Sequence, residues 1–254
     1  MGGEAVIIGG MKIGRVAAAA VMALGMVVAG CSASPSPSPS LPPPTPTPPP
    51  PTADEVIAAF LAVTGDPALT MHVVADGKVT VSAGGTTDNV NIALDMDISG
   101  QNGFGKAVVD TGPTDLTVDM LLLDNRAYID DNGTWTEVPD YKPTTPLNPF
   151  TGLGGPADLT YRGAEEGDDG RIHHLSVEVW LGGDLTQLEA QGWSGVKVDY
   201  ELTTVTADDQ GNPIEMVFSG GVSGRFQDVA ASAAFDVTYT FTNIGEPVEI
   251  PTPS

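Results

Sequence analysis

Apolar and polar residues alternate along most of the chain, and this alternation restricts the possible folds more than any other feature of the sequence. In residues 90–98, apolar side chains occupy every even position, while Asn, Ala and Asp occupy the odd ones. Successive side chains of a β-strand point to opposite faces, so the pattern predicts an antiparallel strand with one buried and one hydrated face. It recurs in residues 69–83, 116–122, 159–161, 175–179, 196–202, 214–218 and 233–241.

The parity of residues 69–83 predicts how this stretch folds. Most of its apolar residues lie at odd positions: Leu69, Met71, Val73, Val79, Val81 and Ala83. A two-residue hairpin at Asp76 and Gly77 would pair odd with even positions and divide this apolar set between two faces. We therefore expect one long strand, bent or bulged at Gly77, with a three-residue hairpin as the alternative.

Turn-forming residues separate the strands at residues 124–125, 130–133, 167–170 and 208–213. Short strands are expected at residues 127–129 and 135–138. Leu121 and Leu123 make the end of the strand at residues 116–122 apolar on both faces, so we expect cover on both sides there. The sequence thus predicts a mostly β, α+β domain with about eight to eleven antiparallel strands.

A helix is predicted to begin directly before the first strand. Thr52 and Glu55 have the spacing of a capping box, in which each side chain accepts a hydrogen bond from the backbone of the other. The next apolar residues share one helical face, and Gly65 and Pro67 end the pattern. That face consists of Val56, Ile57, Phe60 and Leu61. A second short helix is predicted at residues 184–190, capped by Asp184.

Residues 140–157 interrupt the strand pattern. Four prolines, at positions 143, 146, 149 and 156, remove backbone donors and preclude a regular ladder. The segment also carries apolar side chains that need cover: Tyr141, Leu147, Phe150 and Leu153. We interpret it either as a loop that plugs an open end of the sheet or as the lid of a cavity.

The N-terminal region has the features of an export signal. Lys12 and Arg15 precede an uncharged run at residues 16–28, which is too short for a bilayer core of about 30 Å but typical of a signal peptide. Residues 28–31, Val-Ala-Gly-Cys, resemble a bacterial lipobox, and this resemblance implies cleavage before Cys31 and a diacylglycerol on its thiol. Cys31 is the chain's single cysteine, so it has no disulfide partner within the chain. An ordinary signal peptide ending beside a cysteine is the alternative, and the start codon is Met1 or Met11.

Residues 32–51 consist of Ser, Pro and Thr with one Leu, which favours an extended polyproline II tether. At about 3.1 Å per residue it would reach roughly 60 Å. The predicted organisation is therefore a signal peptide at 1–30, the lipidated cysteine and linker at 31–52, a β domain at 53–250 and a tail at 251–254. No nucleic-acid partner is expected, since removal of the signal changes the formal charge from −23 to −24 and phosphate binding needs clustered cations.

Catalytic and metal motifs are weak, and we expect neither an enzyme nor a cofactor. Residues 192–195, Gly-Trp-Ser-Gly, lack the second glycine of a nucleophile elbow, so a turn before a strand is favoured. His173 and His174 are neighbours on a strand and should point to opposite faces as surface or half-buried residues, with no shared metal. The Asp-rich turns lack EF-hand spacing, so no metal site is predicted.

The order of these segments resembles the LolA-like superfamily, and more closely lipid-binding lipoproteins of the LppX/LprG type. The resemblance spans about residues 53–250. It rests on five runs: LLLDNRAYI at 121–129, GTWTEV at 133–138, YRGAEE at 161–166, DDQGNP at 208–213 and YTFTNIGEPVEI at 239–250. It implies a curved half-barrel sheet packed on one or two helices, with an apolar cavity that takes acyl chains and no catalytic motif.

These features together predict an exported monomer, anchored to the outer face of the cell membrane through lipidated Cys31. We expect it to bind or carry the acyl chains of a lipid or glycolipid. The candidate lipid-binding residues are Leu94, Met96, Met120, Leu147, Phe150 and Leu153. The alternative is a lipoprotein module that binds no ligand and serves as a surface scaffold.

Overall fold

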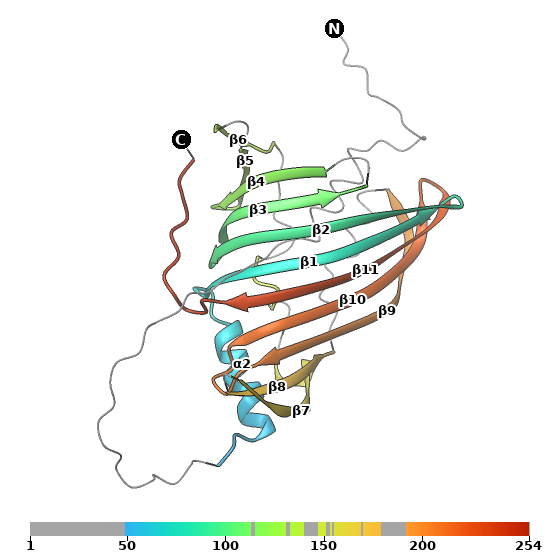
Figure 1. Cartoon of the computed structure of the whole chain (residues 1–254). Helices are drawn as coiled ribbons and strands as arrows, with labels where there is room; N and C mark the ends of the chain where they lie inside the picture. Colours follow the sequence, from blue (N-terminus) through green and yellow to red (C-terminus); the bar gives the residue numbers. More distant parts are fainter. Residues whose placement is uncertain are drawn as a thin grey trace.

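The computed structural model describes residues 49–112, 115–130, 133–139, 147–150, 153, 155–168, 170–178 and 192–253. Within these residues one helix, α2 (Ala53–Thr64), precedes eleven strands of a single antiparallel sheet (Figure 1). The strands are β1 (Thr70–Ala83), β2 (Thr86–Ser99), β3 (Asn102–Asp110), β4 (Asp115–Leu123), β5 (Arg126–Asp130), β6 (Trp135–Glu137), β7 (Leu159–Gly167), β8 (Gly170–Val177), β9 (Trp193–Ala207), β10 (Pro213–Phe226) and β11 (Val229–Thr242).

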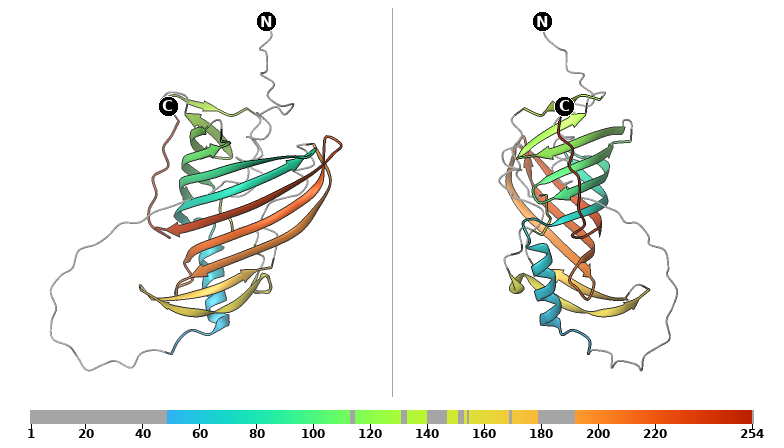
Figure 2. Two further views of the ribbon diagram at one scale, coloured as in Figure 1. Left: turned by 45° about the vertical axis from the view of Figure 1, so that its right-hand side comes forward. Right: turned by 90° about the vertical axis from the view of Figure 1, so that its left-hand side faces the viewer.

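The strand order is β6-β5-β4-β3-β2-β1-β11-β10-β9-β8-β7. The last strand therefore pairs with the first, while β6 and β7 form the two edges of an open sheet. Figure 2 shows that the sheet is curved and twisted, with α2 at one end of its strands. The predicted mostly β class with a curved antiparallel sheet is confirmed.

β1 is one long strand, as its parity indicated. Its pairing with β2 and β11 runs without a register shift, so the bulge expected at Gly77 is absent and the hairpin alternative is wrong. The glycine has a different role. A Cβ atom there would lie 2.8 Å from both the Asp236 carbonyl oxygen and Val237 Cγ2, so Gly77 permits the close approach of β11.

The strand registers bring most apolar alternating positions to one face, which we call the inner face. On this face Val73 lies between Met96 and Phe241, and Ala75 between Leu94 and Tyr239. On the flanking strands, the inner face also includes Ala107, Val109, Val118, Met120, Phe218, Val222, Phe235 and Val237. Its buried members form one core with Val56, Ile57 and Phe60 of α2.

The predicted alternation of residues 196–202 is only partly correct. β9 has a register shift against β10 at this point: Tyr200 pairs with Gly221, but Val198 pairs with Val222. The extra residue, Asp199, is a bulge that reverses the parity of the strand. Val198 therefore lies on the inner face, whereas Leu202, four residues later, lies on the outer face.

α2 begins and ends as predicted. Thr52 and Glu55 form the capping box, with the Glu55 carboxylate accepting from the Thr52 backbone N–H at 2.7 Å. This contact lowers the pKa of Glu55. The turn after β9 touches the helix so closely that a Cβ atom on Gly211 would lie 2.3 Å from the Ala59 carbonyl carbon. Gly211 thus lets the sheet pack on the helix backbone.

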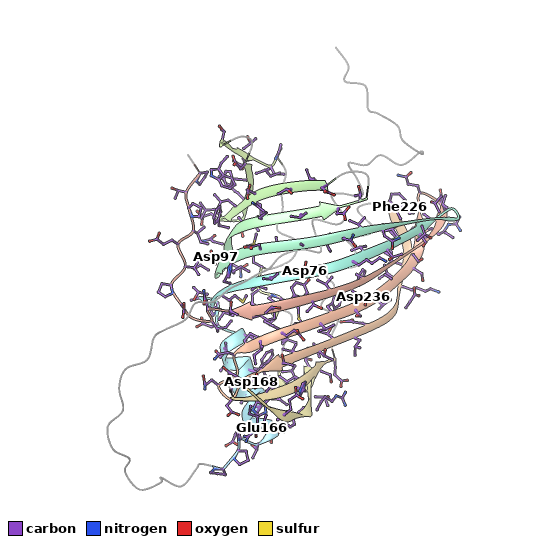
Figure 3. All side chains as sticks on the ribbon, in the orientation of Figure 1. Asp76, Asp97, Glu166, Asp168, Phe226 and Asp236 are labelled. Atoms are coloured by element: carbon purple, nitrogen blue, oxygen red, sulfur yellow. The ribbon has the colours of Figure 1, made fainter. Side chains whose placement is uncertain are left out.

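The outer face is polar except near β4. Short side chains hydrogen-bond across its strands, for example Ser219 to Asp236 at 2.6 Å. Figure 3 marks Asp76, Asp97 and Asp236 along it. Leu121 is fully buried on this face, opposite Phe104 and Tyr128. The expectation that this end of β4 is covered on both sides is therefore confirmed.

Several predictions fall outside the described residues. These are the signal segment, Cys31, most of the tether, the helix at 184–190, and Tyr141 with Pro143 and Pro146. Among the residues that the structure does describe, α2 is the only α-helix, and its 12 residues are too few to cross a membrane.

Candidate functional site

The inner face is the candidate site, because it gathers the apolar side chains of strands far apart in the sequence. Between Met71 and Ala83, every β1 residue on this face is apolar or glycine. The facing positions of β2 are also apolar from Val90 to Ile98. The nine residues from Met71 to Val79, which face Val90–Ile98, span roughly 30 Å. The described strands therefore form a continuous apolar lane along the sheet.

One end of this lane is closed by an aromatic cluster. Phe150 is only 2% exposed. Its ring centroid lies 5.3 Å from that of Phe60 on α2 and 5.2 Å from that of Phe241 on β11. Leu147 covers β3, where a Cβ atom on Gly103 would lie 3.1 Å from Leu147 Cδ1. Residues 147–150 therefore fill the space between the helix and the sheet.

Asn148 holds this segment in place. Its side-chain nitrogen donates to the Thr64 carbonyl at 2.8 Å, and its side-chain oxygen accepts from the Phe150 backbone N–H at 2.9 Å. Thr64 is the last residue of α2, where carbonyls lack partners within the helix. No periodic pattern in the sequence indicated Asn148, because its partner lies 84 residues away.

The rest of the inner face reaches solvent at several points. Large apolar side chains with more than a third of their surface exposed are Leu116 (44%), Ile129 (39%), Val198 (41%), Leu202 (57%) and Val229 (44%). Strand register places all of them except Leu202 on the inner face. The exposed apolar surface of the described strands is thus concentrated on one face.

The six predicted lipid-binding residues divide between these regions. Leu94, Met96, Leu147 and Phe150 are buried in the core, while Met120 and Leu153 are partly buried against it. Met120 pairs with Ile129, one of the exposed residues. Sequence reasoning missed Leu116, Ile129, Val198 and Val229. Parity indicated the face for Leu116, but nothing local indicated exposure.

A polar pair interrupts the apolar surface on β9. Glu201 and Thr203 both lie on the inner face, and the Thr203 hydroxyl donates to Glu201 Oε1 at 3.4 Å. Gly220 stands opposite Glu201. Beside this pair, the rings of Phe218 and Phe235 stack with centroids 5.4 Å apart. The inner face therefore carries one polar pair on β9.

His173 was expected at the surface or half-buried, and this is wrong: only 1% of it is exposed. Its Nε2 lies 2.7 Å from Asp209 Oδ1, and its Nδ1 lies 3.1 Å from the Tyr161 hydroxyl. These partners allow the ring to be buried. His174 points to the other face and is half-buried, as predicted. The described residues contain no cluster of metal ligands.

Burial shifts the pKa of Tyr239 and of His72. It raises the pKa of Tyr239 to about 12 and lowers the pKa of His72 to about 4. His72 Nδ1 lies 2.6 Å from Asp97 Oδ1 but is not aligned for a hydrogen bond. The neutral ring, rather than an ion pair, therefore describes His72 at neutral pH.

No protein-family model and no curated protein matches the chain by sequence. Among solved structures it is similar to LprF from Mycobacterium bovis, with a TM-score of 0.41, 15% identity, and coverage of 80% of this chain and 98% of that one. It is also similar to the LolA superfamily protein NE2245 from Nitrosomonas europaea, with a TM-score of 0.28, 8% identity, and coverage of 79% and 95%.

A third similar structure is a putative outer membrane lipoprotein-sorting protein domain from Vibrio parahaemolyticus, with a TM-score of 0.24 and 9% identity. It matches 77% of this chain and 93% of that one. Sequence identity is 15% or lower in all three cases.

Proposed function

We propose that this protein binds the acyl chains of a lipid or glycolipid on its inner face, outside the cytoplasmic membrane. The observation that supports this most directly is the distribution of exposed apolar side chains. Four of the five large ones in the described strands belong to the inner face, whereas the outer face is covered with Asp, Ser and Thr. A surface that is apolar on one side only is typical of a binding face.

The dimensions of the inner face also suit an acyl chain. A bilayer core of about 30 Å holds two chain lengths, so one extended chain measures roughly 15 Å. The apolar lane of β1 is about twice as long. Each methylene group that leaves water contributes about 0.8 kcal/mol, so ten buried methylenes would supply enough free energy for tight retention.

The experiment is mass spectrometry of an organic extract of the purified chain, made without residues 1–30 and with Cys31→Ser. All described helices and strands lie within residues 53–242 and are kept. We expect acyl lipid to co-purify, and Val198→Asp to reduce it several-fold by placing a charge on the inner face. Leu202→Asp is the matched control, since Leu202 is exposed on the outer face.

Two outcomes would contradict this proposal. If the wild-type extract contains no acyl lipid, the interaction-module alternative replaces it. If Leu202→Asp lowers the lipid content as much as Val198→Asp does, the ligand is not on the inner face. Melting curves of both variants serve as the folding control.

We further propose that lipidated Cys31 anchors the protein. After the signal segment, the sequence has no apolar run long enough to span a bilayer, so acyl chains on Cys31 would be the main attachment. We expect Cys31→Ser in the full chain to move the protein from the membrane fraction to the soluble fraction. A variant that stays with the membranes to the same extent as the wild type after a high-salt wash would contradict the anchor.

A further inference from the structure

We infer that the far end of β9, β10 and β11 docks on the lipid surface of a membrane, with Trp193, Phe226 and Val229 entering its interfacial layer. We call these three residues the apolar tip. The inference rests on the proposed function, because it names the route by which acyl chains reach the inner face. The docking itself can be measured separately.

The three residues of the tip come together through strand register. Phe226 pairs with Val229 across the β10–β11 turn and with Trp193 across the start of β9. The rings of Trp193 and Phe226 have centroids 5.9 Å apart. Both rings are half-buried, and Val229 is exposed. Figure 3 shows Phe226 at the far end of the long strands, away from α2.

The turn that carries the tip is short and is held by hydrogen bonds. Gln227 and Asp228 both have positive φ, 50° and 65°, so β10 and β11 are joined by a tight two-residue turn. The Gln227 backbone N–H donates to the Gly192 carbonyl at 3.2 Å. Arg225 donates to the Asp228 carbonyl. The first bond ties the turn to the start of β9, and the second lies within the β10–β11 turn itself.

The neighbouring β1–β2 turn lies beside the tip and leaves Val229 uncovered. The Gly84 backbone N–H lies 3.5 Å from the Ala230 carbonyl oxygen. Gly84 has no side chain to cover Val229, and even a Cβ atom there would lie 3.5 Å from Val229 Cγ1. Two hairpin turns thus reach the same end of the sheet (Figure 1).

Side-chain chemistry favours a lipid surface as the occupant. Trp has an apolar ring system and one N–H donor, which suits the boundary between head groups and acyl chains. Strand register places Lys197, Arg225, Asp88, Asp199 and Asp228 near the tip. Among these described residues, the two cations offset two of the three carboxylates. The chain as a whole is strongly acidic, and an anionic membrane surface would repel it.

The tip is continuous with the inner face. Val222 and Ala231 lie next to it along β10 and β11 and are buried. Val198 is exposed beside Val222. An acyl chain that leaves a bilayer at the tip would therefore meet apolar side chains at once. This matters because exposing a chain to water costs about 0.8 kcal/mol per methylene.

The predicted tether permits this contact. α2 follows the tether and lies at the end of the sheet opposite the tip (Figure 1). The fourteen residues of β1 span roughly 46 Å. The tether is predicted to reach roughly 60 Å, so the tip can face the membrane in which Cys31 is anchored.

The test uses the chain from residue 31 with Cys31→Ser and phosphatidylcholine vesicles whose acyl chains carry bromine, which quenches nearby tryptophan. We expect the vesicles to quench wild-type fluorescence and this quenching to be largely lost in Trp193→Phe, which keeps an aromatic ring. In flotation, we expect Trp193→Ser/Phe226→Ser to bind vesicles at least fivefold less than wild type. Leu202→Ser should bind as wild type does.

Bound lipid is measured by mass spectrometry on the same preparations, so the two proposals can fail separately. Unquenched wild-type fluorescence with lipid still bound would overturn docking and leave acyl binding intact. Quenching that depends on Trp193 without bound lipid would support docking and contradict acyl binding. If the double variant fails to fold, the comparison of wild type with Trp193→Phe still decides. The wild type could also fail to contact vesicles but bind an envelope protein that the double variant no longer binds. That result would assign the tip to a protein partner and overturn the inference.

Discussion

The two ends of the inner face are built from the same strands but differ in what covers them. At the α2 end, Phe60, Phe150 and Phe241 close the face, and Met96 and Leu94 beneath the cover are almost fully buried. Toward the other end and the β4–β5 edge, apolar side chains of the same alternating pattern are exposed. The difference shows that alternation decides which face a residue joins, whereas a separate packing element decides whether that residue becomes core or surface.

The largest effect is expected at the closed end. Met96→Asp would bury an unpaired carboxylate, which costs several kcal/mol or forces its protonation. Asp95→Ala is the matched control, because Asp95 is the neighbouring residue and is exposed on the outer face. Thermal melts should show a large fall in Tm for the first variant and little change for the second. Similar melts would contradict the register of β2, and Leu94→Asp with Asp97→Ala provides an independent pair.

Replacing one phenylalanine by alanine at each end of the inner face measures how differently the two ends are covered. Phe150→Ala should lower the free energy of unfolding by about 3 kcal/mol or more, since a buried ring leaves a cavity. Phe226→Ala should cost at most about 1 kcal/mol because its ring is half-buried. Urea denaturation checks both. Equal losses would mean that the far end is packed as tightly as the closed end.

The link between the cover and the helix can be removed without changing apolar packing. Asn148→Ala leaves the Thr64 carbonyl and the Phe150 N–H without this partner, so we expect a loss of about 1–3 kcal/mol. Asn91→Ala is the control, because the bond from Asn91 to Asp110, at 3.0 Å, is exposed. Hydrogen exchange at residues 147–150 should become faster only in the Asn148 variant. Unchanged exchange would show that the aromatic contacts alone hold the segment.

The smallest effect on stability is expected at the β4 edge. Leu116→Ser removes an apolar side chain that is already 44% exposed, so the free energy of unfolding should change by no more than about 0.5 kcal/mol. The same variant should nevertheless reduce co-purified acyl lipid, because Leu116 belongs to the inner face. A marked fall in Tm would instead assign Leu116 to the core, and the exposed part of the inner face would then not include Leu116.

The sequence by itself determined the local features of this protein. Alternation identified most of the strands, although β3 (Asn102–Asp110) was not predicted. The odd parity of residues 69–83 predicted a single β1, and the spacing of Thr52 and Glu55 marked the start of α2. These features follow from backbone geometry over a few residues, since side chains repeat every two positions in a strand and every 3.6 in a helix. The turns between strands were readable for the same reason.

Only the tertiary structure decided which apolar residues of that pattern are covered by other elements and which are exposed to solvent. The Asp199 bulge reversed the parity of β9, so Val198 and Leu202 face opposite sides despite their even spacing. Partners distant in the chain buried His173 beside Asp209 and joined Asn148 to Thr64. Hydrophobic burial and hydrogen bonding act between whatever groups the fold brings together, so a local period can assign a residue to a face but cannot specify what covers it.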